Sequence, residues 1–303
     1  MLFVEQVLNG LQYGAMLFML ASGLTLIFGI MNVINLTHGA FYMVGAYCAA
    51  FAILQTGSFA AGVLAALVGA GVYGVAVELA VIRWLYRRDH LYQVLATFGL
   101  ILFTNEAVSM IFGRRPPLMD IPPLLQGSVT LFPGFAYSEI RLAFIVVGAA
   151  VAVGLWLLVN RSRLGMLIRA GADDRETVDA LGVDIQKLFT IVFGIGALLC
   201  GLAGVMAAPL LAVEIGMGER VLITTFVVIV VGGVGSIRGA LAGALIVGMV
   251  DAMGRAFLPS LLRAVLHPTA ADPLAAGLVS ASVYILMALV LLVRPAGLFP
   301  QGR

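Results

Sequence analysis

The stretch LAFIVVGAAVAVGLWLLV, residues 142–159, contains no charged side chain. A helix rises 1.5 Å per residue, so about 20 apolar residues cross the hydrocarbon core of a bilayer. This stretch therefore predicts a membrane-spanning helix.

Comparable apolar stretches cover nearly the whole chain. Eight others, with boundaries soft by a few residues, are 7–28, 40–54, 59–82, 91–112, 188–213, 221–234, 240–256 and 274–293. Stretches 40–54 and 221–234 are short for a straight span, and each could be a broken or re-entrant helix. The sequence predicts an all-α polytopic membrane protein with about 8–9 transmembrane helices, some Gly-broken or re-entrant, in a single integral membrane domain over residues 1–303.

The composition supports this interpretation. Hydrophobic residues make up 62% of the chain and charged residues 11%, against roughly 25% charged in soluble domains. Too few polar residues are present to cover a water-facing surface, so lipid must solvate much of the outside. The 36 glycines are typical of helices that approach closely in a bilayer. A net charge of only +2 argues against nucleic-acid binding.

Basic residues indicate the orientation, because cytoplasmic loops carry an excess of Arg and Lys. If all nine stretches cross, most basic residues lie on the side of the charged loop 160–187, which is then cytoplasmic. The Pro-rich loop 113–140 is expected on the outer face as irregular structure. It could be a docking surface for a periplasmic protein or a plain connection. The N-terminus could lie on either side.

A polar insert, GIMNVINLTHG at residues 29–39, separates the first two stretches. Asn32, Asn35 and His38 recur every three residues, so a helix or tight turn would place them on roughly one face. They could hydrogen-bond neighbouring helices as structural contacts. With Thr37, they could instead line a substrate pathway, where unwound backbone is tolerated at membrane depth.

A second interruption, VGGVGSIRG, occupies residues 231–239. Paired Gly-broken segments in the two halves of a chain are a pointer to a transport site. Gly232, Gly233 and Gly235 are therefore candidate pathway residues. Alternatively, glycines such as Gly239 and Gly243 simply permit close helix packing.

Ionisable side chains inside the apolar stretches are Glu78, Glu106, Asp251 and Arg255. Each costs about 2.5 to 3.5 kcal/mol at a helix centre, so exposure to lipid is unfavourable. Asp251 and Arg255 have the spacing of a helical ion pair. Glu106 could line the pathway or form a buried interhelical hydrogen bond, and the role of Glu78 stays open.

Catalytic motifs are missing from the sequence. No G-x-x-x-x-G-K-[ST] loop is present, and the three histidines lack metal-ligand spacing. We therefore predict no enzyme activity, no metal and no cofactor in this chain, so any energy for transport must come from elsewhere.

The loop 160–187 holds five basic and five acidic residues with apolar residues between them. Gly182 can end a short helix that starts at about Asp173. A solvated linker would not need the apolar positions, so we favour a helix that docks on a cytoplasmic partner.

Seven short motifs along the chain together resemble one known family of proteins. They are GLTLIFG (23–29), NVIN with HGA (32–35, 38–40), IRA (168–170), DRE (174–176), LGV (181–183), VGGVGS (231–236) and RPAGLF (294–299). In this order they are similar to the LivH-type inner-membrane permeases of bacterial branched-chain amino-acid ABC importers.

The resemblance implies an all-helical permease in the bacterial inner membrane with a homologous second permease, two ABC ATPase subunits that bind ATP and Mg, and a periplasmic substrate-binding protein. It implies that residues 169–182 form the element that couples to an ATPase. The residues assigned to this coupling are Arg169, Ala170, Asp173, Asp174, Arg175, Glu176 and Gly182.

The expected function is passage of a branched-chain amino acid by alternating access. Related permeases for urea, short amides or aromatic acids are alternatives, since no residue settles the substrate. An ion-coupled secondary transporter, with Glu106 or Asp251 as its proton site, is a rival class that would not need the coupling loop.

Overall fold

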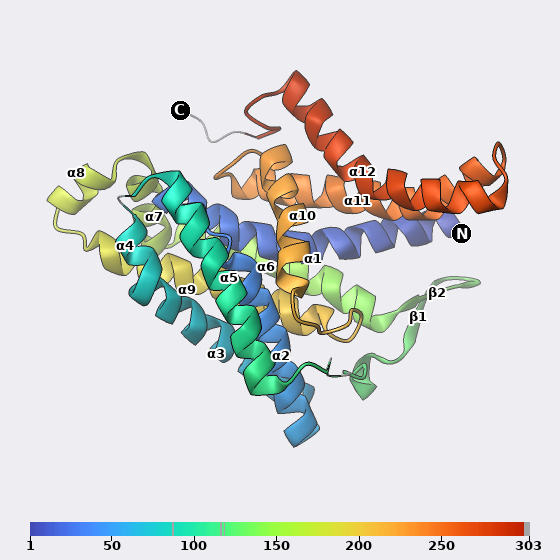
Figure 1. The fold of residues 1–303 in the computed structure, drawn as a ribbon, viewed down its shortest axis with the longest axis horizontal. Helices are drawn as coiled ribbons and strands as arrows, with labels where there is room; N and C mark the ends of the chain where they lie inside the picture. Colours follow the sequence, from blue (N-terminus) through green and yellow to red (C-terminus); the bar gives the residue numbers. More distant parts are fainter. Residues whose placement is uncertain (87, 116, 118, 300–303) are drawn as a thin grey trace. The chain divides into compact units, whose positions relative to one another are not determined.

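A computed structural model of the chain describes residues 1–303 except 87, 116, 118 and 300–303 (Figure 1). The long helices are α1 (Leu2–Met31), α2 (His38–Thr56), α3 (Phe59–Val77), α5 (His90–Phe112), α6 (Glu139–Arg161), α9 (Ile185–Ala207), α10 (Met217–Gly232), α11 (Ile237–Arg263) and α12 (Pro268–Val293). The short elements are the π-helix η1 (Glu78–Ile82), α4 (Arg83–Leu85), the 3-10 helix η2 (Pro123–Leu125), β1 (Ser128–Phe132), β2 (Phe135–Ser138), α7 (Arg163–Asp173) and α8 (Arg175–Ala180).

Eight helices in the described residues are long and apolar enough to cross a membrane, counting α3 through α4 as one. The prediction of an all-α polytopic membrane protein is confirmed. α10, in the stretch 221–234, has 16 residues and ends at Gly232. α2 extends beyond the stretch 40–54 to 19 continuous residues, so it is not a broken helix.

The contacts divide the chain into two compact units. Unit 1 comprises Met1–Ala21, Pro123–Ala149 and the described residues after Ile223, and unit 2 comprises Ser22–Pro122 and Ala150–Ile223. The expected single membrane domain stays a prediction.

In unit 2, α2, α3 and α9 pack with their backbones in close approach. A Cβ at Gly45 of α2 would lie 2.5 Å from the Cα of Gly201 in α9, and one at Gly201 would lie 2.7 Å from the carbonyl oxygen of Ala66 in α3. Small residues at these crossings allow the dense helix packing that apolar side chains alone cannot drive in lipid.

In unit 1, α11 packs against α12 and against the N-terminal part of α1. Gly10 and Gly14 of α1 face Gly248 and Ala244 of α11, again with almost no space for a Cβ. The glycine content therefore serves close helix contacts in both units.

The loop 113–140 corrects one expectation. Within residues 113–140, β1 and β2 form an antiparallel hairpin that pairs Val129 with Tyr137 and Phe132 with Phe135, so the prediction of irregular structure is wrong here. Aromatic and β-branched residues favour strands, and Gly134, with φ 82°, completes the turn.

Candidate transport and coupling sites

The backbone between α1 and α2 is not helical. α1 ends at Met31, Asn32 adopts a left-handed φ of 51°, and α2 begins only at His38. Asn is one of the few residues that tolerate this conformation. Asn32 is exposed, whereas Asn35, Thr37 and His38 are fully buried. The predicted common face is therefore wrong for Asn32, because the chain turns sharply after it.

The buried part of this break is tied to neighbouring helices. Asn35 Oδ1 accepts a hydrogen bond from the backbone N of Thr37 at 3.0 Å, and Thr37 Oγ1 donates to the carbonyl of Thr97 in α5 at 3.1 Å. His38 Nε2 lies 2.9 Å from the Sγ of Cys200 in α9. Asn35 Nδ2 has no partner within the described residues, although it is buried. An unsatisfied buried donor indicates a place where water or a polar ligand could bind.

The face of α5 toward this break carries polar residues that sequence reasoning missed. Gln93, Thr97 and Thr104 are all buried on α5. Gln93 Oε1 accepts from the backbone N of Ile34 at 3.2 Å, and Thr104 Oγ1 lies 2.5 Å from the hydroxyl of Tyr73. Their spacing of four and seven residues was the available signal, but uncharged threonines are common in apolar helices and did not stand out.

Glu106 does not belong to this polar face. Its side chain is exposed, so the alternative of a buried hydrogen bond is wrong, and its role in the pathway stays a prediction. The neighbouring Asn105 instead donates from Nδ2 to Glu219 Oε1 in the first turn of α10, at 2.5 Å.

The second glycine break has a clear packing role. Gly233 and Gly235 adopt φ values of 108° and 82°, and Ser236 caps α11 by accepting from the backbone N of Gly239 at 3.1 Å. Gly232 and Gly239 meet backbone to backbone where α10 and α11 cross, and Gly243 continues this contact. The packing alternative is confirmed, and a substrate role for Gly232, Gly233 and Gly235 stays a prediction.

The C-terminal RPAGLF segment closes over this same break. The backbone N atoms of Leu298 and Phe299 donate to the carbonyls of Val231 and Gly232, at 2.9 and 2.8 Å. These carbonyls belong to the last turn of α10, where no intrahelical donor remains. Two motifs that are distant in sequence therefore form one structural feature of unit 1.

The loop 160–187 contains two helices rather than one starting at Asp173. α7 ends at Asp173, and α8 starts after Asp174. The Asp174 carboxylate caps α8 by accepting from the backbone N atoms of Glu176 and Thr177, both at 3.0 Å, and from Thr177 Oγ1 at 2.5 Å. These bonds, first of all that from the Thr177 hydroxyl, lower the pKa of Asp174 below its ordinary value.

Gly182 ends α8 as predicted. Its φ is 88°, its N donates to the carbonyl of Asp179, and the N of Val183 donates to the carbonyl of Val178. This is the Schellman arrangement, which favours glycine at the left-handed position.

The two short helices expose the residues predicted to couple to an ATPase. Six of the seven are exposed, namely Arg169, Asp173, Asp174, Arg175, Glu176 and Gly182. The seventh, Ala170, is half-buried. Ile168 and Val178 are buried underneath, and Leu181 is 78% exposed beside the charges. Met166 of α7 is also exposed, and a charged surface with such large apolar side chains suits a protein partner. We call α7 and α8 together the coupling segment.

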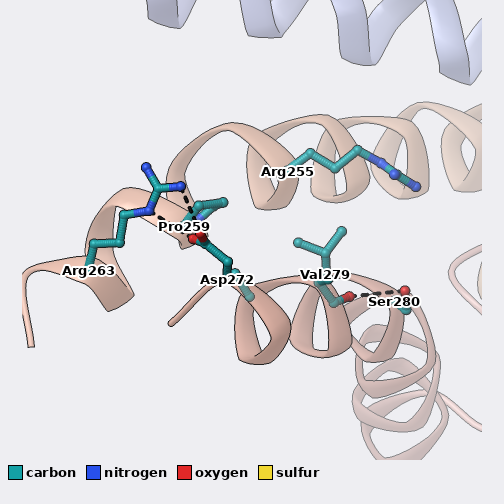
Figure 2. A pocket seen from close by; sticks show the side chains of 8 residues that line it. Arg255, Pro259, Arg263, Asp272, Val279 and Ser280 are labelled. Carbon is teal, nitrogen blue, oxygen red and sulfur yellow. Dashed lines mark hydrogen bonds and ion pairs between the residues drawn. The ribbon is translucent and has the colours of Figure 1, made fainter. Parts of the chain in front are cut away.

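A pocket of about 390 Å³ lies between α11 and α12 in unit 1. Figure 2 shows the Arg263–Asp272 pair bridging the two helices, while Arg255 extends away from it along α11. Arg255 binds Asp251 with two hydrogen bonds of 2.7 and 2.9 Å, which confirms the predicted ion pair. Each arginine therefore already has a carboxylate partner, and the Arg263–Asp272 pair holds α11 and α12 together as a helical hairpin.

Comparisons with known proteins agree with the resemblance. A family model described as "Branched-chain amino acid transport system / permease component" matches residues 6–294. The chain is 30% identical to the BraD permease protein of Pseudomonas aeruginosa over 270 residues, covering 83% of this chain and 86% of BraD. It is 28% identical to LivH of Escherichia coli K12 over 310 residues, covering 98% and 95%.

A third relative differs in its solute. The fructose import permease FrcC of Rhizobium meliloti is 31% identical, but over only 112 residues, which cover 35% of this chain and 31% of FrcC. The family match and the long alignments together show that this multi-pass membrane protein belongs to the permease components of branched-chain amino acid transport systems.

Proposed function

We propose that this chain is the transmembrane permease subunit of an ATP-driven importer for branched-chain amino acids. It resides in the bacterial inner membrane and translocates substrate by alternating access. Its partners are a homologous second permease, two ABC ATPases that bind ATP and Mg, and a periplasmic substrate-binding protein.

The observation that carries this proposal is the coupling segment. α7 and α8 rest on α9 through buried apolar residues and expose a charged surface. A secondary transporter working alone would need no such surface. The long alignments to BraD and LivH, both named as permease proteins for branched-chain amino acids, favour that substrate class over fructose, whose permease aligns over a third of the chain.

The buried break from Asn35 to His38, facing Gln93 and Thr97, is where we place the substrate path within unit 2. Its side chains offer hydrogen-bond donors and acceptors without a fixed charge. Such groups suit a zwitterion that must be bound and released quickly. Opening of this path would follow from movement of the coupling segment.

Reconstitution tests this function. We expect proteoliposomes with this chain, its partner permease, the ATPases and the binding protein to accumulate leucine only when ATP is supplied. Vesicles with this chain alone should not accumulate leucine, even in a proton gradient. Uptake by the lone chain in such a gradient would favour the secondary transporter instead.

A further inference from the structure

Glu78 is an intramembrane carboxylate for which neither the sequence nor the family match supplies a role. It has no exposed surface and lies at the start of the π-helix η1, which continues α3 into α4. In η1 the backbone N of Arg83 donates to the carbonyl of Glu78, five residues back, instead of four. Such π-turns interrupt α-helices mainly at functional positions.

Three side chains satisfy the Glu78 carboxylate. Arg83 donates from Nε and Nη2 at 3.4 and 3.3 Å, and the hydroxyl of Tyr86 donates to Oε1 at 2.6 Å. Thr190 Oγ1 of α9 lies 2.9 Å from Oε2. Two of the donors therefore come from α4 and the residue after it, beyond the π-helix, and one comes from α9.

The hydroxyl of Thr190 has two acceptors for its single proton. Besides Glu78 Oε2 at 2.9 Å, the carbonyl of Gln186, one turn earlier in α9, lies 3.0 Å from Oγ1. Because only one of these bonds can form at a time, the direct link between α9 and Glu78 has two arrangements of similar geometry, while Thr190 Oγ1 also accepts from Arg83 Nη2 at 3.0 Å. This is the kind of discrete alternative through which packed helices transmit a displacement.

The first turns of α9 connect this cluster to the coupling segment. Leu188 faces Gly171 of α7, the ring of Phe189 packs edge-on against Tyr86 at 5.1 Å, and Thr190 reaches Glu78. Three consecutive residues thus contact the coupling segment, the residues after α4 and the π-turn. Figure 1 shows α4, α7 and α8 at one end of unit 2.

The residues around the end of α4 are also linked, through Gln93 of α5, to the non-helical segment between α1 and α2. Gln93 Nε2 donates to the carbonyls of Leu85 and Arg88, at 3.2 and 3.1 Å, while Gln93 Oε1 accepts from the backbone N of Ile34. Ile34 directly precedes Asn35. A continuous set of packing contacts and hydrogen bonds therefore runs from α7 through α9 and Glu78 to the end of α4. From there it continues through Gln93 to the unwound segment between α1 and α2.

We infer that Glu78 and Thr190 are positioning residues that relay movement of the coupling segment to the buried break between α1 and α2. The π-turn is the element that changes conformation during this movement. Glu78 contacts no substrate. It holds α9 and the end of α3 together so that displacement of α7 reaches Gln93. This inference rests on the proposed function, because it assigns the route by which ATP hydrolysis would act on the path.

Thr190→Val tests the relay, because valine keeps the shape of threonine but cannot bond Glu78, which retains Arg83 and Tyr86. Leucine uptake and ATP hydrolysis are measured in the same proteoliposomes of the complete transporter. We expect leucine transported per ATP hydrolysed to fall about three-fold or more, with hydrolysis retained. Thr190→Ser, which keeps the hydroxyl, should restore the ratio.

The matched control is Thr25→Val in α1. Thr25 is buried, whereas Thr190 is half-buried, and the Thr25 hydroxyl has no partner within the described residues, so this variant should leave the ratio unchanged. Tyr86→Phe, which keeps the ring against Phe189 but removes the 2.6 Å bond, should lower the ratio as Thr190→Val does.

The outcomes are distinguishable. A wild-type ratio in both Thr190→Val and Tyr86→Phe would overturn the relay. So would a parallel loss of uptake, hydrolysis and folded protein, since that is the result of a purely structural contact. Absence of ATP-dependent uptake in the wild-type transporter would instead refute the proposed function.

Discussion

At the scale of single residues, neighbouring polar side chains in one insert have opposite environments. Asn32 is exposed and supplies a left-handed backbone, whereas Asn35 is buried with a side-chain donor that lacks a partner in the described structure. Asn32 therefore allows the backbone to turn, and Asn35 places a hydrogen-bonding side chain in the protein interior.

We therefore expect Asn35→Ala to reduce leucine uptake strongly, because it removes both the buried donor and the acceptor of the Thr37 amide. Asn32→Gly should keep uptake, since glycine adopts a φ of 51° without strain. The measurement is uptake by the complete transporter per amount of permease in the membrane. Equal loss in the two variants would contradict a path through Asn35.

A second residue-scale prediction concerns Asp174. Its pKa is lowered because its ionised form accepts hydrogen bonds from Thr177 and Glu176. The stabilisation is therefore fully present above the ordinary pKa of 3.8 and is lost as the pH falls through the lowered value.

Thr177→Val removes the bond from the hydroxyl, which is the largest cause, and should raise the pKa of Asp174 toward 3.8. NMR titration of the labelled carboxyl in detergent measures this shift. As a control, the same substitution at Thr25, in α1, should leave that pKa unchanged. An unmoved pKa in Thr177→Val would show that the backbone bonds alone hold the carboxylate.

At the scale of elements, glycine contacts set how closely helices pack. A Cβ at Gly45 would collide with the backbone of Gly201 in α9, while one at Gly99 of α5 would meet nothing within 4 Å. Identical substitutions should thus have opposite effects on stability.

We expect Gly45→Ala to destabilise the protein by about 1–3 kcal/mol, because two backbones must separate. Gly99→Ala should be neutral or stabilising by up to about 1 kcal/mol, from the higher helix propensity of alanine. Thermal unfolding of the purified protein in detergent measures both. A neutral Gly45→Ala would mean that α2 and α9 are less tightly packed than the structure shows.

At the scale of the whole molecule, the coupling segment is the surface where charge should govern transport. Arg169 and Asp174 also bond within the protein, to the carbonyl of Val159 and to the first turn of α8. Arg175 is exposed in that first turn, where an acidic residue is favourable to the helix dipole. Reversal of its charge therefore changes the surface but keeps α8.

Arg175→Glu should lower ATP-dependent uptake several-fold while the permease remains inserted and folded, because like charges weaken or misalign the ATPase contact. Uptake and co-purification of the ATPases measure the effect. Lys187→Glu, at an exposed position in the first turn of α9, is the control for a charge reversal outside α7 and α8, and it also removes the Lys187–Asp184 ion pair. Unchanged uptake and assembly in Arg175→Glu would remove α8 from the interface.

Much of the architecture follows from the sequence alone. Runs of apolar residues long enough to cross a bilayer predict the helices directly. The reason is that lipid requires every span to be apolar and to satisfy its backbone hydrogen bonds within itself. The end of α8 at Gly182 was also predictable, since a left-handed turn after a helix selects glycine locally. The motifs spread from residue 23 to residue 299 were enough to indicate the family.

Tertiary structure decided which polar groups meet. Spacing placed Asn32 with Asn35 and left Glu78 without a role, yet burial separates the first two and surrounds Glu78 with donors that include Thr190 of α9. Gln93 and Thr190 carry no charge, and at most the spacing of Gln93 with Thr97 and Thr104 hinted at a polar face in the sequence. The physical reason is that a hydrogen bond between residues about a hundred positions apart depends on how helices pack, whereas the bilayer acts on each span separately.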